Sequence, residues 1–191
     1  MSRPAAVPAG SDRTAEAALW TAIGAGCALF VIRPSFAGHP WTPGALLAAY
    51  LLIGTVAALA PVRTGSPASF GVVPVTLIGG AAVLVATSAA GASFPSPRTA
   101  EILALNTVAA VAEELFFRKM VFGGLLRFGA LVAVAGSAIL FALVHVPIYG
   151  AAAFPVDLGA GLLFSWQRWA SGGWGASATT HVFANLMAVV R

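Results

Sequence analysis

Residues 112–119 read Ala112-Glu113-Glu114-Leu115-Phe116-Phe117-Arg118-Lys119 and put four formal charges into an otherwise apolar run. Each charged side chain costs roughly 2.5 to 3.5 kcal/mol at the centre of a membrane helix, so this cluster must be paired, hydrated or functional. On a helix, Glu114 and Arg118 are four residues apart with the acid first, which favours an ion pair. Glu113 lies about 100° round the helix, without that partner. The pattern predicts a structural Glu114–Arg118 pair and a working carboxylate at Glu113.

The composition excludes an ordinary soluble domain. The chain has 191 residues, of which 59% are hydrophobic and only 8% charged, whereas about 25% of a typical soluble domain is charged. The basic residues behind the net charge of +4 are scattered singly, so they form no nucleic-acid footprint and are interpreted as loop and helix-end anchors. Cys27 is the single cysteine, which excludes a disulfide framework and a thiolate metal cluster.

Apolar windows long enough to cross a bilayer occur about seven times, divided by Pro, Gly and Arg. They run from about Ala15 to Ile32, Gly44 to Val62, Phe70 to Ala90, Glu101 to Leu126, Phe128 to Val146, Ala151 to Trp169 and Trp174 to Val190. The sequence therefore predicts an all-α, polytopic bundle of about seven transmembrane helices with an intramembrane polar cavity. We expect one membrane domain over residues 15–191, with its catalytic part at about 100–191, after a disordered polar lead at residues 1–14.

Two prolines suggest where helices end. Arg33-Pro34 stops the first window, and the fifth ends at His145-Val146-Pro147. Because a proline disfavours helical geometry in the residue before it, we expect His145 near the end of its helix.

The strongly polar residues inside the windows gather on three of them. They are Glu113, Glu114 and Arg118 on the fourth, His145 on the fifth, and His181 with Asn185 on the last. Residues four apart share a helix face, as His181 and Asn185 do, and as Phe141 and His145 do. Taken singly, a histidine near a helix end can be a packing residue and an asparagine can be interhelical glue. Jointly, these costly side chains at membrane depth favour a functional site.

Hydrolysis is the chemistry that these groups could perform. A carboxylate beside a histidine can take a proton from water and return it to a leaving amine, and a second histidine and an amide can stabilise an oxyanion. No serine lies in a nucleophile-elbow pattern, and the only thiol is in the first window. Glu113, His145 and His181 could instead hold a divalent metal such as zinc, assembled from three helices because no His-Glu-x-x-His motif is present.

Three patterns, in this order, resemble the CPBP family of CAAX-protease and bacteriocin-processing (Abi) intramembrane peptidases. They are Glu-Glu-x-x-x-Arg at 113–118, Phe-x-x-x-His at 141–145 and His-x-x-x-Asn at 181–185. The resemblance implies that Glu113 and His145 activate the attacking water and that His181 and Asn185 form the oxyanion site. Glu114, Arg118 and Phe141 would then support the site.

The resemblance also implies a setting. It implies a protein of the bacterial cytoplasmic membrane, in contact with lipids and with a membrane-associated peptide or protein substrate, and with no nucleic acid partner. It implies a glutamate mechanism without a cofactor, with a metal-dependent version as the alternative. The substrate stays open between a CAAX-like tail, a bacteriocin-type peptide and a C-terminal sorting tail. Family members related to CAAX proteases commonly have eight spans against about seven here, which weighs against a prenylated CAAX tail.

Three hypotheses follow from these residues. The leading one is an intramembrane endopeptidase. The second is a non-catalytic membrane scaffold or immunity protein that keeps the polar cluster as structural glue. The third is a small transporter in which Glu113 and the two histidines relay protons. The lack of a visible internal repeat counts against transport.

Overall fold

The computed structural model describes residues 9–62, 70–90 and 100–190, and within them every regular element is a helix. The α-helices are α1 (Ala9–Ile32), α2 (Thr42–Leu59), α3 (Val72–Ala90), α4 (Ala100–Glu114), α5 (Phe122–Leu125), α6 (Ala130–Tyr149), α7 (Phe154–Ser171) and α8 (Gly175–Val190). Three 3-10 turns, η1 (Arg33–Phe36), η3 (Leu126–Phe128) and η4 (Ala151–Ala153), join some of them. A π-helix, η2 (Leu115–Val121), connects α4 to α5.

The all-α prediction is confirmed, and the protein is a helical membrane protein. Four of the described helices have the length and hydropathy to cross a bilayer: α1 together with η1, α2, α3 and α6. The remaining windows also form helices, but α4 ends in two glutamates, α7 carries Asp157 and Arg168, and α8 is 16 residues long. The prediction of about seven spans is thus supported for four helices and stays a prediction for the others.

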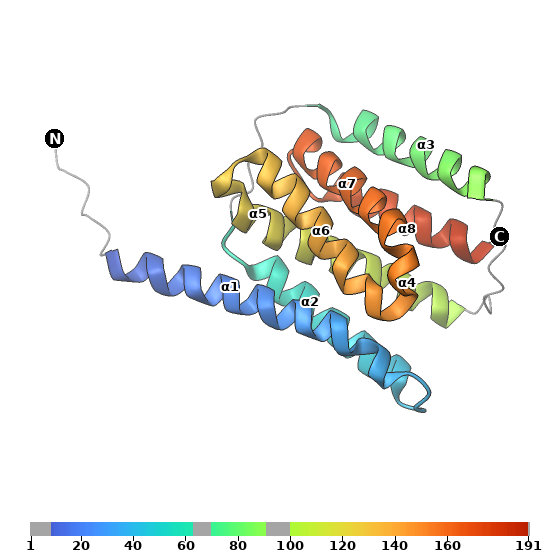
Figure 1. The fold of residues 1–191 in the computed structure, drawn as a ribbon, viewed down its shortest axis with the longest axis horizontal. Coiled ribbons are helices and arrows are strands. Elements are labelled where there is room, and N and C mark those ends of the chain that lie inside the picture. Colours follow the sequence, from blue (N-terminus) through green and yellow to red (C-terminus); the bar gives the residue numbers. More distant parts are fainter. Residues whose placement is uncertain (1–8, 63–69, 91–99, 191) are drawn as a thin grey trace.

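The helices form layers, with outer helices on two sides of a central group (Figure 1). The long helix α1 and its neighbour α2 lie along one side of the molecule, and α3 lies on the opposite side against α7 and α8. Between them, α4 contacts both α2 and α8, while α6 packs along α7. The helices that carry Glu113, His145 and His181 are therefore the central ones.

A row of aromatic rings ties α1 to this centre. Phe30 of α1 contacts Phe116 of η2 with ring centroids 5.3 Å apart, and Phe116 meets Phe117 at 4.9 Å. Phe117 in turn meets Phe141 of α6 at 5.4 Å, edge to face. All four rings are buried. The two phenylalanines of the charged stretch thus anchor η2 in the core, which fixes the residues on either side of them.

A glycine allows the closest helix contact near the site. A Cβ on Gly161 of α7 would lie 2.9 Å from the carbonyl oxygen of Ala138 on α6. In lipid, the hydrophobic effect does not drive helices together. Close approach of the two backbones stabilises their contact instead, through van der Waals packing. The carbonyl of Gly161 consequently comes within reach of a side chain from η2.

Two expected boundaries differ from the structure. Helix α1 begins at Ala9, inside the expected disordered lead, of which residues 1–8 lie outside the described residues. Helix α6 continues through Pro147 to Tyr149 and ends at Gly150, whose φ of 81° favours glycine. Pro147 lies inside the last turn, where it cannot make the helical hydrogen bond to the carbonyl four residues earlier. His145 is still one turn from the helix end, as predicted.

Substitutions at Gly79 and Gly80 test how α3 packs against α7 and α8. A Cβ on Gly79 would lie 2.1 Å from Nε2 of Gln167 and 2.6 Å from Oγ1 of Thr180, whereas one on Gly80 would meet nothing within 4 Å. We expect Gly79→Ala to cost about 1 to 3 kcal/mol, as overpacking does. Gly80→Ala should be neutral or slightly stabilising, because alanine favours helix.

The measurement is the thermal unfolding midpoint of the detergent-solubilised protein, followed by the loss of the monodisperse peak in size-exclusion chromatography. Equal midpoints for the two variants would contradict the docking of α3 on Gln167 and Thr180.

Candidate active site

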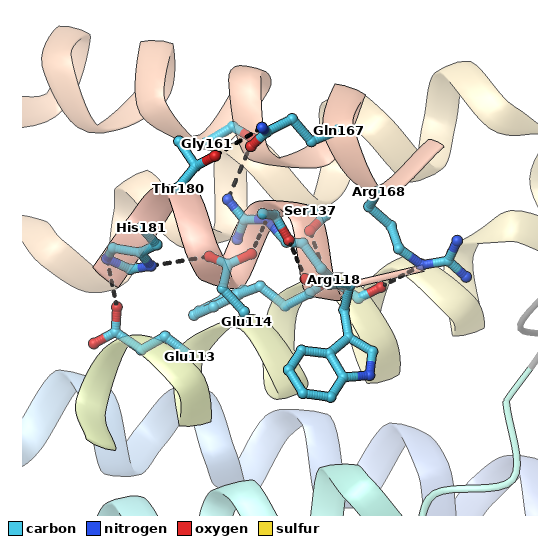
Figure 2. A network of polar contacts seen from close by, with 12 residues as sticks. Glu113, Glu114, Arg118, Ser137, Gly161, Gln167, Arg168, Thr180 and His181 are labelled. Atoms are coloured by element: carbon cyan, nitrogen blue, oxygen red, sulfur yellow. Dashed lines mark hydrogen bonds and ion pairs between the residues drawn. The ribbon is translucent and has the colours of Figure 1, made fainter. Parts of the chain in front are cut away.

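The polar site is built on a π-helix. In η2 the backbone widens directly after Glu114. Such π turns are rare in proteins overall, but those that occur are often found at functional sites. Side chains from neighbouring helices bind its carbonyls: the Ser137 hydroxyl of α6 donates to Phe117 O at 2.8 Å, and Nε of Arg168 of α7 donates to Arg118 O at 3.0 Å (Figure 2). The widened turn is therefore held from two sides.

Lys119 has a structural part in the charged cluster. Its Nζ donates to the carbonyls of Ala57, at 2.9 Å, of Ala58, and of Ala60, at 3.3 Å. Ala57 and Ala58 lie in the last turn of α2, and Ala60 follows the helix. Carbonyls at a helix C-terminus lack intrahelical partners, and a lysine can bind them. Lys119 thus joins the end of α2 to η2.

The predicted ion pair between Glu114 and Arg118 is present. Nε of Arg118 lies 3.3 Å from Oε2 of Glu114, and both side chains are fully buried. The guanidinium also donates from Nη2 to Gly161 O at 3.3 Å and lies over the ring of Phe141, 4.6 Å from its centroid. A buried charge needs this set of partners, because burial without them is costly.

Glu114 also fixes the orientation of His181. Its Oε1 lies 3.0 Å from Nδ1 of His181, and because a carboxylate only accepts, Nδ1 must carry the proton. The other ring nitrogen, Nε2, lies 3.9 Å from Oε2 of Glu113. Figure 2 shows His181 between the two carboxylates. The ring of Phe164 stacks on the imidazole with centroids 4.8 Å apart.

His145 is oriented in the same sense by the backbone. Its Nδ1 lies 2.7 Å from the carbonyl oxygen of Phe141, one turn earlier on α6. A carbonyl is an acceptor, so here too Nδ1 carries the proton. Nε2 faces Glu113 and lies 3.6 Å from Oε2. Both imidazoles therefore turn the same nitrogen toward one carboxylate oxygen.

Glu113, which cannot share Arg118 with Glu114, is paired with a different arginine. Nη1 of Arg33 lies 3.0 Å from Oε1 of Glu113 and also donates to the hydroxyl of Tyr50 at 2.5 Å. Arg33, at the start of η1, looked like a loop anchor that ends the first window. Its partner lies 80 positions away, so helix spacing could not reveal the pair. Glu113 is 4% exposed, and this cation lowers the cost of burying it.

Arg33 and Tyr50 are thus the site residues that sequence reasoning missed. One signal was available for Tyr50, which places a hydroxyl inside the second apolar window. A buried tyrosine hydroxyl usually has a hydrogen-bond partner. No feature of the sequence indicates which partner that is.

Asn185 lies beside the cluster. It follows His181 by one turn of α8, as predicted, and its Nδ2 donates to the carbonyl of Asn106 at 3.4 Å. Asn106 precedes Glu113 on α4 by about two turns. The structure therefore brings Glu113, His145 and His181 together and places Asn185 on the adjoining stretch of the α4–α8 contact.

Metal binding finds little support in the geometry. In the part of the chain that the structure describes, no group of three or more His, Cys, Asp or Glu side chains is arranged to hold a metal ion. The guanidinium of Arg33 already places a positive charge on Glu113, and a divalent cation at the same carboxylate would be repelled by it. A metal held by Glu113, His145 and His181 stays the alternative prediction.

An apolar groove of about 370 Å³ lies between α2 and α4, beside the site. Its lining includes Tyr50 and Gly54 from α2 and Ala112 and Leu115 from the α4–η2 segment. Tyr50 and Ala112 are direct neighbours of the cluster, since one binds Arg33 and the other precedes Glu113 in the chain.

A buried carboxylate facing two imidazoles, inside a bundle of apolar helices, defines a helical membrane protein with an enclosed Glu–His–His site. Residues 95–187 match the family described as Type II CAAX prenyl endopeptidase Rce1-like. Over this segment, which is slightly less than half of the chain, the protein is similar to the CPBP/CAAX protease family, whose members hydrolyse peptide bonds.

The matched segment contains Glu113, His145, His181 and Asn185, whereas Arg33 and Tyr50 lie before it. No curated protein and no solved structure matches the chain.

The Glu114–Arg118 pair can be tested by removing its charges in turn. Arg118→Met leaves Glu114 as a buried, unpaired charge, so we expect a loss of about 3 to 5 kcal/mol in unfolding free energy. Adding Glu114→Gln should restore part of this loss, because no unpaired charge remains. The control is Arg127→Met, which removes an exposed arginine paired with Glu16 and should leave the unfolding midpoint unchanged. A double variant that is less stable than Arg118→Met would contradict the pairing.

Proposed function

We propose that this protein is an intramembrane endopeptidase of the bacterial cytoplasmic membrane, which hydrolyses a peptide bond in a membrane-associated peptide or protein tail. The observation that carries the proposal is the convergence of two imidazole Nε2 atoms on Oε2 of Glu113, at 3.6 and 3.9 Å. The protease family of residues 95–187 supports the same reaction class.

The attacking water would be activated between Glu113 and His145. Their separation of 3.6 Å is longer than a direct hydrogen bond and is of the kind that a water molecule commonly bridges. With the proton of His145 on Nδ1, both Nε2 and the carboxylate are acceptors, so each can take a hydrogen bond from the same water. Glu113 then accepts one proton as general base while the water oxygen forms a bond to the scissile carbonyl carbon.

Collapse of the tetrahedral intermediate completes the reaction. The carbonyl re-forms as its carbon–nitrogen bond breaks, and the proton held by Glu113 passes to the leaving amine. Arg33 stays on Oε1 of Glu113 throughout, so the reacting oxygen is Oε2. The products are a carboxylic acid and an amine, which exchange a proton to give a carboxylate and an ammonium group, and the enzyme returns to its starting protonation state.

The oxyanion role of His181 requires a second proton on its ring. With Nδ1–H donated to Glu114, Nε2 of the neutral ring has no hydrogen to give. Protonated His181 would be stabilised by the carboxylate of Glu114 and could donate from Nε2 to the developing oxyanion. Asn185 can contribute a further N–H, because its bond to Asn106 O is long at 3.4 Å.

The groove between α2 and α4 suits an apolar substrate segment, because it lies beside Glu113 and its lining is mostly apolar. The transporter and scaffold hypotheses receive no comparable support. The match of residues 95–187 to a protease family favours neither of them.

The proposal predicts that Glu113→Gln abolishes cleavage. The substitution keeps the side-chain volume and removes the base, so we expect a loss of about 10²-fold or more. The measurement compares the C-termini of membrane proteins in cells that produce the wild type or the variant. Glu101→Gln is the matched control, because Glu101 lies exposed in the first turn of the same helix. Unchanged C-termini together with retained partner binding in Glu113→Gln would favour the scaffold.

A separate prediction concerns metals. A glutamate mechanism needs no metal, so treatment of the purified protein with EDTA or 1,10-phenanthroline, followed by removal of the chelator, should leave the cleavage rate unchanged. The rate is measured on the substrate identified from the C-terminal comparison. Loss of activity that returns on addition of Zn²⁺, with no change in the unfolding midpoint, would favour the metal-dependent alternative.

A further inference from the structure

The helices of the bundle run between two opposite ends of the molecule (Figure 1). At one end α1 passes through η1 toward α2, and α6 passes through η4 into α7. At the other end α2 finishes, α5 passes through η3 toward α6, and α7 is followed by α8. We call them the η1 end and the η3 end. Because apolar helix faces form the sides of a membrane bundle, water reaches the site through one of these two ends.

The catalytic candidates lie close to the η1 end. Arg33, at the start of η1, binds Glu113. His145 lies one turn before the end of α6, and about 22 Å along the helix from its start. The ring of Tyr149, in the last turn of α6, stacks on the imidazole of His145 with centroids 5.8 Å apart, and Tyr149 is itself exposed. The η1 end therefore gives water and substrate the shorter way to the site.

The path from the site toward the η3 end is filled with side chains. The chain leads from Glu114 to η3 through residues that are at most 1% exposed, which are Phe116, Phe117, Met120, Val121 and Phe122. Ser137 and Arg168 bind carbonyls of this segment from the neighbouring helices α6 and α7. The site is therefore closed on this side and is reached from the η1 end.

The basic residues gather at the closed end. Most of the described lysines and arginines lie at the η3 end, which are Arg13 near the start of α1, Lys119 on the last turn of α2, Arg127 in η3 and Arg168 in the last turn of α7. Among the described residues, Arg33 is the only lysine or arginine at the η1 end, and it is bound to Glu113. Arg118 lies between the two ends, in its buried pair with Glu114.

Chain order gives the same balance for the remaining arginines. Arg3 precedes α1 and Arg63 follows α2, whereas Arg98 precedes α4 and Arg191 follows α8. In membrane proteins, the loops and helix ends on the cytoplasmic side carry an excess of lysine and arginine, and acidic residues count little in this rule. The bias therefore assigns the η3 end to the cytoplasmic side.

We infer that the catalytic site opens toward the outer face of the membrane and acts on peptides or protein tails that have been exported across it. The inference rests on the proposed peptidase function and adds the substrate class, which is chains whose scissile bond lies outside the cytoplasm. It follows from two independent features of the bundle, the position of the opening and the distribution of positive charge.

The first test places the two ends by cysteine labelling of the full-length protein in intact cells. Cys27, the native cysteine in α1, is replaced by alanine. Single cysteines are then introduced at exposed positions, as Ala37→Cys and Ala152→Cys at the η1 end and Ala15→Cys at the η3 end. Ala15 is next to Glu16, which pairs with Arg127 of η3.

Cells are treated with a membrane-impermeant maleimide and then with a permeant one of different mass, and the protein is analysed by mass spectrometry. We expect Ala37→Cys and Ala152→Cys to carry the impermeant label, and Ala15→Cys to carry the permeant one. In inside-out membrane vesicles the pattern should reverse. A variant counts only if it keeps the wild-type peak in size-exclusion chromatography, and the two η1-end positions check each other.

The second test locates the substrates. C-termini of all proteins are compared between cells that produce the wild type and cells that produce Glu113→Gln, and each terminus that differs is assigned to the cytoplasm or to the outer side by its accessibility to an added carboxypeptidase in intact cells. We expect the termini that depend on Glu113 to be accessible from outside.

The outcomes separate the inference from the function on which it rests. The reverse labelling pattern, or equal labelling of both ends in intact cells, would overturn the inference and leave the peptidase intact. Termini that depend on Glu113 but remain in the cytoplasm would overturn it in the same way. If no terminus depends on Glu113, the proposed function and the substrate class both fail, even where labelling places the η1 end outside.

Discussion

Burial of charge in an apolar bundle is the constraint on which the rest of this structure depends. Two consecutive acids, Glu113 and Glu114, lie almost completely out of contact with solvent. Because consecutive side chains on a helix diverge by about 100°, each acid can have its own arginine. Glu114 pairs with Arg118 within the charged stretch, and Glu113 pairs with Arg33 from the far end of α1. The dipeptide thereby connects the two halves of the protein.

The orientation of the two histidine rings depends on the groups that bind their Nδ1 atoms. His145 donates to a backbone carbonyl and His181 to Glu114, so each ring is fixed in orientation and in tautomer before any substrate arrives. The π-helix contributes by placing Arg118 against Phe141 and Gly161 while Ser137 and Arg168 bind its free carbonyls. In the proposed reaction, this preorganisation would lower the reorganisation needed.

Local patterns in the sequence predict the helices and part of the candidate site. The apolar windows predicted helices, the four-residue spacing predicted the Glu114–Arg118 pair, and Pro147 placed His145 near a helix end. The convergence of three helices came from the resemblance of three short patterns to one family. Arg33 was missed because its contact spans 80 positions and an arginine at the end of an apolar window looks like an anchor. The π-helix was missed because a widened turn leaves the hydrophobic pattern of seven residues almost unchanged.

The segment that defines the family is not electrostatically complete. It supplies both acids, both imidazoles and the arginine that neutralises Glu114, yet the cation on Glu113 comes from η1 and the hydroxyl that orients this cation comes from α2. Without them Glu113 would be a buried carboxylate without an arginine partner, an arrangement that burial disfavours. The α1–α2 hairpin is held in place by Phe30 in the core and by Lys119 on the end of α2. The first half of the chain, which by sequence matches only ordinary membrane spans, is therefore part of the site. The packing that anchors it also brings Arg33 to the carboxylate of Glu113.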